Sequence, residues 1–114
     1  MRIVEKPWGH EEIWAETSRY AGKYLHIKRG HRLSRQYHEK KEETIRVISG
    51  VLVLEIGSGP DEILRLEKGD VYHVAPLTIH RFGADANDDV VLVEVSTTEL
   101  DDVVRLADDY SRSL

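Results

Sequence analysis

The sequence of 114 residues contains no cysteine. This absence excludes disulfide bonds and any site that depends on a thiolate as metal ligand or nucleophile. No apolar run approaches the length that a membrane-spanning helix needs, and the N-terminus lacks the apolar core of a signal peptide. We therefore expect a cytoplasmic protein that does not enter a membrane.

An excess of positive charge is also missing, since the formal net charge at pH 7 is −5. This balance gives no reason to expect a nucleic-acid partner. Lys and Arg nevertheless outnumber Asp and Glu in residues 1–50, and the reverse holds in residues 51–114. A basic half suits an anionic small substrate, whereas solvated surface charge is the simpler alternative. The chain length predicts one domain, residues 1–114, with one core.

Long helical patterns are absent before residue 99, and short strands separated by turn residues are present instead. The predicted strands are rich in Val, Ile, Tyr and Trp, and several of them alternate in polarity. Strands without crossover helices favour an antiparallel sandwich or barrel. A short C-terminal helix is expected over Glu99–Ala107. The predicted strands are Glu11–Ala15, Tyr24–Lys28, Leu33–His38, Thr44–Ser49, Val51–Ile56, Glu62–Leu66, Asp70–Val74, His80–Ala84 and Val90–Ser96.

Residue types that bind metals occur in two separate segments. Gln36 and His38 lie two positions apart on a predicted strand, so their side chains share one face. Glu43 begins the next apolar strand, and His80 follows much later. If they converge, these four side chains suit a borderline divalent ion with open positions for a substrate. The alternatives are histidines with structural hydrogen bonds and an ion pair between Glu43 and Arg46.

The spacing of these residues resembles the cupin superfamily. The first cupin motif reads Gly, five residues, His-x-His, three or four residues, Glu, six residues and Gly. Gly30 and Gly50 bracket the segment at that spacing, and Gln36 stands in place of the first histidine. The second motif is similar to Gly69 followed by Pro76–His80. The resemblance implies an all-β, single-domain cupin, which is a double-stranded β-helix or jelly-roll barrel.

The departures from the cupin pattern narrow the resemblance to one group. Zinc-dependent phosphomannose isomerases use Gln, His, Glu and His as metal ligands. The chain is most similar to the C-terminal isomerase domain of the bifunctional (type II) mannose-1-phosphate guanylyltransferase/mannose-6-phosphate isomerases. We expect a stand-alone domain, for which nucleotidyltransferase activity is not implied. The elements that carry the likeness are Lys6–Gly9, Ser34–His38, Ile79–Arg81 and Asp108–Tyr110.

The resemblance implies one divalent metal ion bound by Gln36, His38, Glu43 and His80. Zinc is the first expectation, and manganese, iron, nickel and cobalt are the others. The implied activity is aldose–ketose isomerisation of a sugar phosphate, with mannose 6-phosphate and fructose 6-phosphate as the first pair to test. Similar cupins are commonly dimers, so a homodimer is expected as well.

The reaction also requires a base and a cation. The candidates for the base are His73, Glu43 and a metal-bound water, and Arg81 would stabilise the enediolate. Lys28, Arg35 or Arg46 would hold the phosphate. Two other functions stay open at this point: a metal-dependent oxygenase, and a non-catalytic sugar-binding or sensor cupin.

Overall fold

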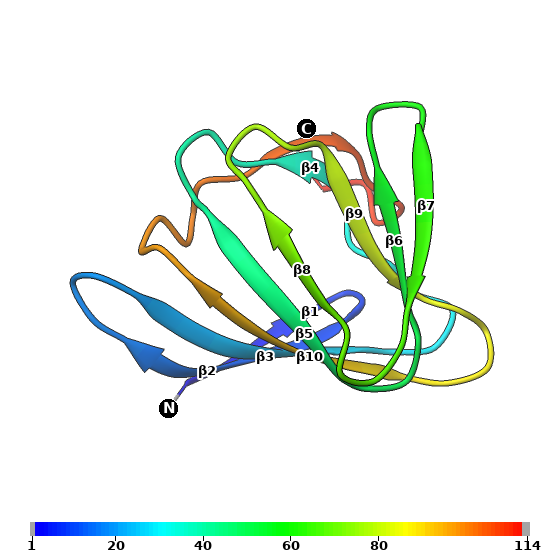
Figure 1. The fold of residues 1–114 in the computed structure, drawn as a ribbon, viewed down its shortest axis with the longest axis horizontal. Helices are drawn as coiled ribbons and strands as arrows, with labels where there is room; N and C mark the ends of the chain where they lie inside the picture. The colour runs from blue at the N-terminus through cyan, green and yellow to red at the C-terminus, as the bar shows by residue number, and fades with distance from the viewer. Residues whose placement is uncertain (1, 113–114) are drawn as a thin grey trace.

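The computed structural model describes residues 2–112, and these form eleven β-strands and no helix (Figure 1). The strands make two antiparallel sheets, which confirms the predicted all-β class. The six-stranded sheet has the order β1 (Arg2–Lys6), β2 (Gly9–Glu16), β3 (Ala21–Ile27), β10 (Val90–Ser96), β5 (Glu43–Ser49) and β8 (Val71–Val74). The five-stranded sheet has the order β11 (Val104–Ala107), β4 (Arg35–Tyr37), β9 (His80–Ala84), β6 (Leu52–Ile56) and β7 (Glu62–Leu66).

The apolar core lies between the two sheets, at one end of the barrel. Along β3 and β10 every second side chain faces inward, as the pleat of a strand requires. The strand register places Leu25 opposite Leu92 and Ile27 opposite Val90. These four side chains are at most 2% exposed, and Phe82 of the facing sheet packs in the same cluster. Burying one such side chain contributes about 1.5–3 kcal/mol, so this end stabilises the barrel.

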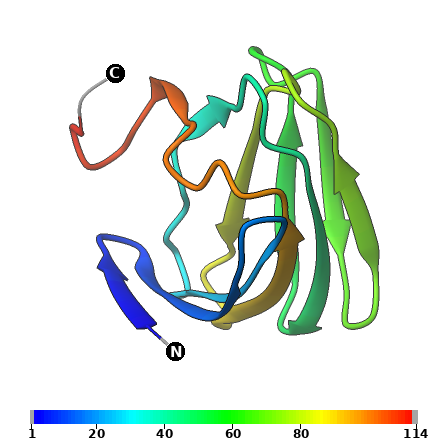
Figure 2. The same ribbon diagram turned by 90° about the vertical axis from the view of Figure 1, so that its left-hand side faces the viewer.

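The inward-facing positions become charged at the other end of the same strands. Lys23 continues the inward row of β3, Glu94 continues that of β10, and Glu43 begins that of β5. All three side chains are buried. Figure 2 looks toward this end, and the orange segment that follows β10 crosses it. The fold therefore encloses a polar site beneath the C-terminal segment.

The predicted helix over Glu99–Ala107 is wrong, because this segment contains strand β11. Arg105 of β11 lies opposite Gln36 of β4, and Val104 lies opposite Tyr37. Consecutive β-branched valines favour a strand, and a helix this short is marginal without strong tertiary support. Pairing with β11 gives β4 a second neighbour besides β9.

Strand β1 is the other element that the sequence analysis did not predict. It is an edge strand that pairs only with β2, and its apolar Ile3 is 50% exposed. Because neither face of β1 is fully buried, its residues show no apolar alternation to detect. Each of the nine predicted strands corresponds to a strand of the structure. No helix capable of crossing a membrane occurs within residues 2–112.

Candidate metal centre

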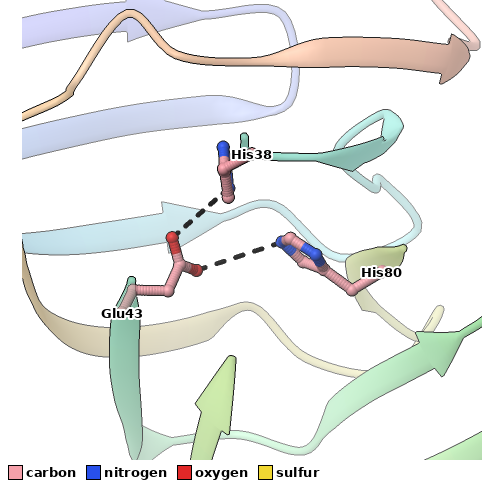
Figure 3. A group of neighbouring side chains, drawn as sticks. All are labelled: His38, Glu43 and His80. Carbon is pink, nitrogen blue, oxygen red and sulfur yellow. Dashed lines mark ion pairs between the residues drawn. The ribbon is translucent and has the colours of Figure 1, made fainter. Parts of the chain in front are cut away.

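Three buried side chains converge at the charged end of the barrel (Figure 3). His38 follows β4, Glu43 begins β5 and His80 begins β9. The Nε2 atom of His38 lies 3.4 Å from Oε2 of Glu43, and Nε2 of His80 lies 4.0 Å from Oε1. One possible ligand atom from each residue lies within 4.8 Å of the other two. We call these three residues the His–Glu–His group.

Backbone carbonyls determine which nitrogen of each imidazole carries the proton. The Nδ1 atom of His38 lies 2.5 Å from the carbonyl oxygen of Asp102, and Nδ1 of His80 lies 2.8 Å from that of Thr78. A carbonyl oxygen only accepts hydrogen bonds, so Nδ1 must donate in both contacts. In the neutral imidazole the lone pair is then on Nε2. Both Nε2 atoms are buried and have no hydrogen-bond partner among the described residues.

The electrostatics of the group favour a bound cation. Burial lowers the pKa of His80, so its imidazole is neutral near pH 7 and presents a lone pair. Burial alone would raise the pKa of Glu43, but the ammonium of Lys41, 2.9 Å away, helps to hold it well below its usual range, so Glu43 is ionised. A carboxylate that faces two imidazole lone pairs is repelled unless positive charge lies between them.

The donor set fits a divalent transition metal. Ligand atoms about 2.1 Å from one ion lie roughly 3.0–3.4 Å from each other. The 3.4 Å separation between His38 and Glu43 lies at the edge of this range, and the 4.0 Å separation between His80 and Glu43 is wider. Two imidazole nitrogens and one carboxylate oxygen suit zinc and its neighbours and leave coordination positions open. The orphaned Nε2 atoms are the observation that supports this fit.

Gln36, the fourth ligand predicted from sequence, faces the same side of the sheet. It lies on β4 directly opposite His80 of β9, and residues directly opposite on paired strands share a face. Its Oε1 atom accepts a hydrogen bond from the Ser34 hydroxyl at 2.7 Å. Its side chain lines the same cavity as His38 and Glu43. Gln36 is thus adjacent to the group, and its role as a ligand stays a prediction.

Buried charges of alternating sign lead away from the His–Glu–His group across the six-stranded sheet. Nζ of Lys41 lies 2.9 Å from Glu43 and 3.0 Å from Glu94. Lys23 lies 3.8 Å from Glu94 and forms a close ion pair with Glu11. Lys6 of the edge strand lies 3.5 Å from the other oxygen of Glu11. The charge row therefore consists of Glu43, Lys41, Glu94, Lys23, Glu11 and Lys6.

Burial acts differently on the members of the charge row. Burial opposes the charge of Lys41, but Glu94 and Glu43 outweigh it and raise the pKa of the ammonium above its usual range. Burial and the nearby charge of Glu43 raise the pKa of Glu94, and Lys41 and Lys23 offset this only in part. Among the carboxyl groups of the charge row, burial therefore favours the protonated form most at Glu94.

The charge row lines a cavity of about 80 Å³ together with Gln36 and His38. A site for one water needs only about 10–15 Å³ by the same kind of measure, so an ion and several waters fit. Arg105 of β11 lines this cavity from the side opposite the charge row. Its Nε atom is buried and has no hydrogen-bond partner among the described residues.

Arg105 is the candidate site residue that the sequence analysis missed. The predicted helix over Glu99–Ala107 gave its side chain no defined direction. Arg105 lies opposite Gln36, which in turn lies opposite His80, so one row of three strands presents all three side chains to the same face. The valines at positions 103 and 104 were the available sign of a strand.

Arg81 and His73, the catalytic residues proposed from sequence, lie outside the cavity. Neighbours on a strand face opposite sides, so Arg81 points away from His80. It is buried beneath the C-terminal segment, where it donates to the carbonyl oxygens of Leu33 (2.9 Å) and Ala107 (3.2 Å). His73 is exposed on the outer face of the six-stranded sheet, beside Glu42. Neither residue lines the cavity, and their catalytic roles stay predictions.

Comparison with known proteins gives a consistent result. Residues 1–108 match the family model described as mannose-6-phosphate isomerase C-terminal. The xanthan biosynthesis protein XanB of Xanthomonas campestris pv. campestris is 30% identical over 98% of this chain. The alginate biosynthesis protein AlgA of Pseudomonas aeruginosa is 26% identical over 96% of it. The chain spans only 24% and 23% of the lengths of these relatives.

Solved structures share the fold at low sequence identity. KdgF from Halomonas sp. superposes with a TM-score of 0.76 at 20% identity, over 89% of this chain and 91% of KdgF. Rru_A2000 from Rhodospirillum rubrum, a cupin-2 domain, superposes with a TM-score of 0.74 at 12% identity, over 84% of this chain and 64% of that one. The cupin fold predicted from the sequence motifs is confirmed.

Proposed function

Because the chain belongs to the family of mannose-6-phosphate isomerase C-terminal domains, we propose that it is a metal-dependent sugar-phosphate isomerase. Mannose 6-phosphate and fructose 6-phosphate are the proposed pair of substrates. The ligands of the metal are Gln36 and the His–Glu–His group, and zinc is the proposed metal. The observation that carries this proposal is the pair of buried Nε2 lone pairs aimed at Glu43.

The proposed ligands would leave coordination positions of a bound ion open to substrate oxygens. A divalent ion in this site would supply Lewis-acid polarisation to the carbonyl and hydroxyl oxygens at C1 and C2 of the sugar. The reaction then requires a group that moves one proton between these carbons and a cation near the oxygens that gain negative charge.

Glu94 is the group that we assign to proton transfer. It lies in the wall of the cavity, it is fully buried, and its pKa is raised by burial and by Glu43. The carboxylate takes the proton from C2 of the aldose, and the electrons of the broken C2–H bond form the C1–C2 double bond of an enediol. The carboxyl group then gives a proton to C1 of the ketose, while the proton on the C2 oxygen moves to the C1 oxygen. Exchange of the carboxyl proton with solvent between the two transfers allows deuterium to enter the sugar. A base whose pKa lies nearer neutrality performs both transfers better than an ordinary glutamate.

Arg105 is the cation that we assign to the developing negative charge. Arg105 lines the cavity, and its Nε–H is a buried donor with no hydrogen-bond partner within residues 2–112. The strand register places Arg105 on the same face as Gln36 and His80. Donors that are already oriented stabilise charge without the cost of reorganisation. Arg105 takes the role that the sequence analysis gave to Arg81.

The test of this function is isotope exchange in heavy water. The protein loaded with zinc is incubated with mannose 6-phosphate in deuterium oxide, and the sugar is analysed by NMR. Isomerisation predicts fructose 6-phosphate and deuterium at C1 or C2, and both should disappear after chelation. A sensor cupin would bind the sugar phosphate saturably without conversion or label. That outcome would replace the isomerase proposal.

The homodimer stays a prediction, for which the outer face of the six-stranded sheet is the proposed contact. This face exposes the apolar side chains of Trp14, Val95 and Val71, which are 45–59% accessible. Two copies related by a two-fold axis would cover both faces at once. A monomer in light scattering at micromolar concentration would disprove the dimer.

A further inference from the structure

One residue of the C-terminal segment touches the metal-binding loop at four points. The backbone carbonyl of Asp102 faces Nδ1 of His38 at 2.5 Å. Its carboxylate accepts hydrogen bonds from the backbone N–H groups of Glu39 (3.1 Å), Lys40 (2.7 Å) and Lys41 (3.0 Å). These three residues belong to the loop that joins His38 to Glu43. Asp102 thus holds the segment between two residues of the His–Glu–His group.

The two kinds of contact act on different parts of the group. The carbonyl keeps the proton of His38 on Nδ1, so the Nε2 lone pair is directed into the site. The carboxylate binds three consecutive N–H groups, which fixes the path of the loop and the distance between His38 and Glu43. It also anchors the backbone that carries the carbonyl, because both groups belong to one residue.

We propose that Asp102 is a positioning residue that sets the metal affinity of this site through the tautomer and orientation of His38. The proposal rests on the metal site of the proposed function. Groups that orient metal-binding histidines typically change metal affinity about 10- to 100-fold when they are removed. Asp102 itself touches neither the metal position nor the substrate cavity, so its effect passes through His38 and the loop.

The test compares Asp102→Ala and Asp102→Asn with the matched control Asp101→Ala. Asp101 is the exposed neighbour in the same segment, and no side-chain hydrogen bond holds it to the loop within residues 2–112. Zinc affinity is measured by competition with a chromophoric chelator. We expect a loss of about 10- to 100-fold for Asp102→Ala. A smaller loss is expected for Asp102→Asn, whose amide keeps one acceptor oxygen. The control should bind zinc like the unmodified protein.

A second measurement reads the tautomer directly and separates positioning from general loss of stability. Nitrogen-15 NMR of the metal-free protein, with His38 assigned from the His38→Ala variant, should show the proton on Nδ1. The same spectrum of Asp102→Ala should show a mixture of both tautomers while other histidines are unchanged. If Asp102→Ala is not folded, the zinc affinity and the tautomer of His38 can still be compared between Asp102→Asn and the unmodified protein.

The outcomes distinguish this inference from the proposed function. Failure of the unmodified protein to bind any divalent metal would overturn the proposed function. The tautomer of His38 would still show whether Asp102 positions this imidazole. Zinc affinities of Asp102→Ala and Asp101→Ala within twofold of each other would overturn the inference and leave the metal site in place. A proton found on Nε2 of His38 in the unmodified protein would overturn it as well.

Discussion

The two ends of the barrel interior are built by the same strands and differ in the residues that face inward. On β3 the inward side chains are Ile27 at one end and Lys23 at the other, and on β10 they are Val90 and Glu94. Apolar burial stabilises the fold, whereas burial of charge costs desolvation energy that ion pairs only partly offset. A protein selected only for stability has no need of the charged end. The apolar end therefore stabilises the barrel, and the charged end carries the proposed chemistry, so the two occupy separate layers of one barrel.

The largest stability effect is expected at the apolar end. Leu92 is fully buried, so Leu92→Ala should lower the free energy of unfolding by about 3 kcal/mol because it leaves a cavity. Urea denaturation measures this loss. Turnover per folded molecule should stay near the unmodified level, and a parallel collapse of kcat would show that the two layers are not separate.

The largest effect on turnover is expected two positions along the same strand. Glu94→Gln keeps the shape of the side chain and removes its ability to take a proton, so kcat should fall about 100-fold. The stability loss should be smaller than for Leu92→Ala, because Lys41 keeps Glu43 as a partner and Lys23 keeps Glu11. Steady-state kinetics and urea denaturation are the measurements. Unchanged kcat in a folded variant would remove Glu94 from the proposed reaction.

A moderate effect is expected for Arg105. Arg105→Gln should lower kcat/KM about 10-fold, mainly through kcat, because the cation acts on charge that develops in the transition state. Arg65→Gln is the matched control, since Arg65 is exposed on β7 and pairs with Asp85. An effect on KM alone would assign Arg105 to binding the phosphate.

The smallest expected effect is a loss of thermal stability at low pH that arises in the C-terminal segment. Three hydrogen bonds from Arg112, two from its side chain and one from its backbone N–H, lower the pKa of Asp108 to about 2, from an ordinary value of 3.8. The ionised carboxylate is therefore stabilising above pH 3.8, and this contribution is lost as the pH falls through about 2. Melting temperatures should decline over this window. The decline should be weaker in Asp108→Asn, and identical profiles for both proteins would contradict this assignment.

Much of the barrel could be predicted from local patterns. Strands β7 and β9 match their predicted limits, because turn residues bound both of them in the sequence. Strand β11 escaped prediction because its pairing with β4 depends on contacts distant in sequence. The apolar residues near Leu100 and Val104 satisfy a short helix equally well when that pairing is unknown.

The convergence of the candidate ligands could be predicted from the sequence, and their surroundings could not. The spacing of Gln36, His38 and Glu43 within one segment pointed to a shared cavity, and the structure brings His38 and Glu43 together with His80. Arg81 follows His80 in sequence, yet the strand pleat turns it to the other face, where it secures the C-terminal segment. The charge row could not be predicted, because Lys23 and Glu94 are distant in sequence and meet only through the order of the strands in the sheet.

The central claim is that the His–Glu–His group holds a metal ion, and elemental analysis of the purified, untagged protein tests it most directly. His38→Ala and His73→Ala each remove one imidazole, but only His38 belongs to the group. We expect about one divalent ion per chain in the unmodified protein and in His73→Ala, and a strong loss in His38→Ala. Equal metal content in all three proteins, or none in the unmodified protein after zinc is supplied, would contradict it.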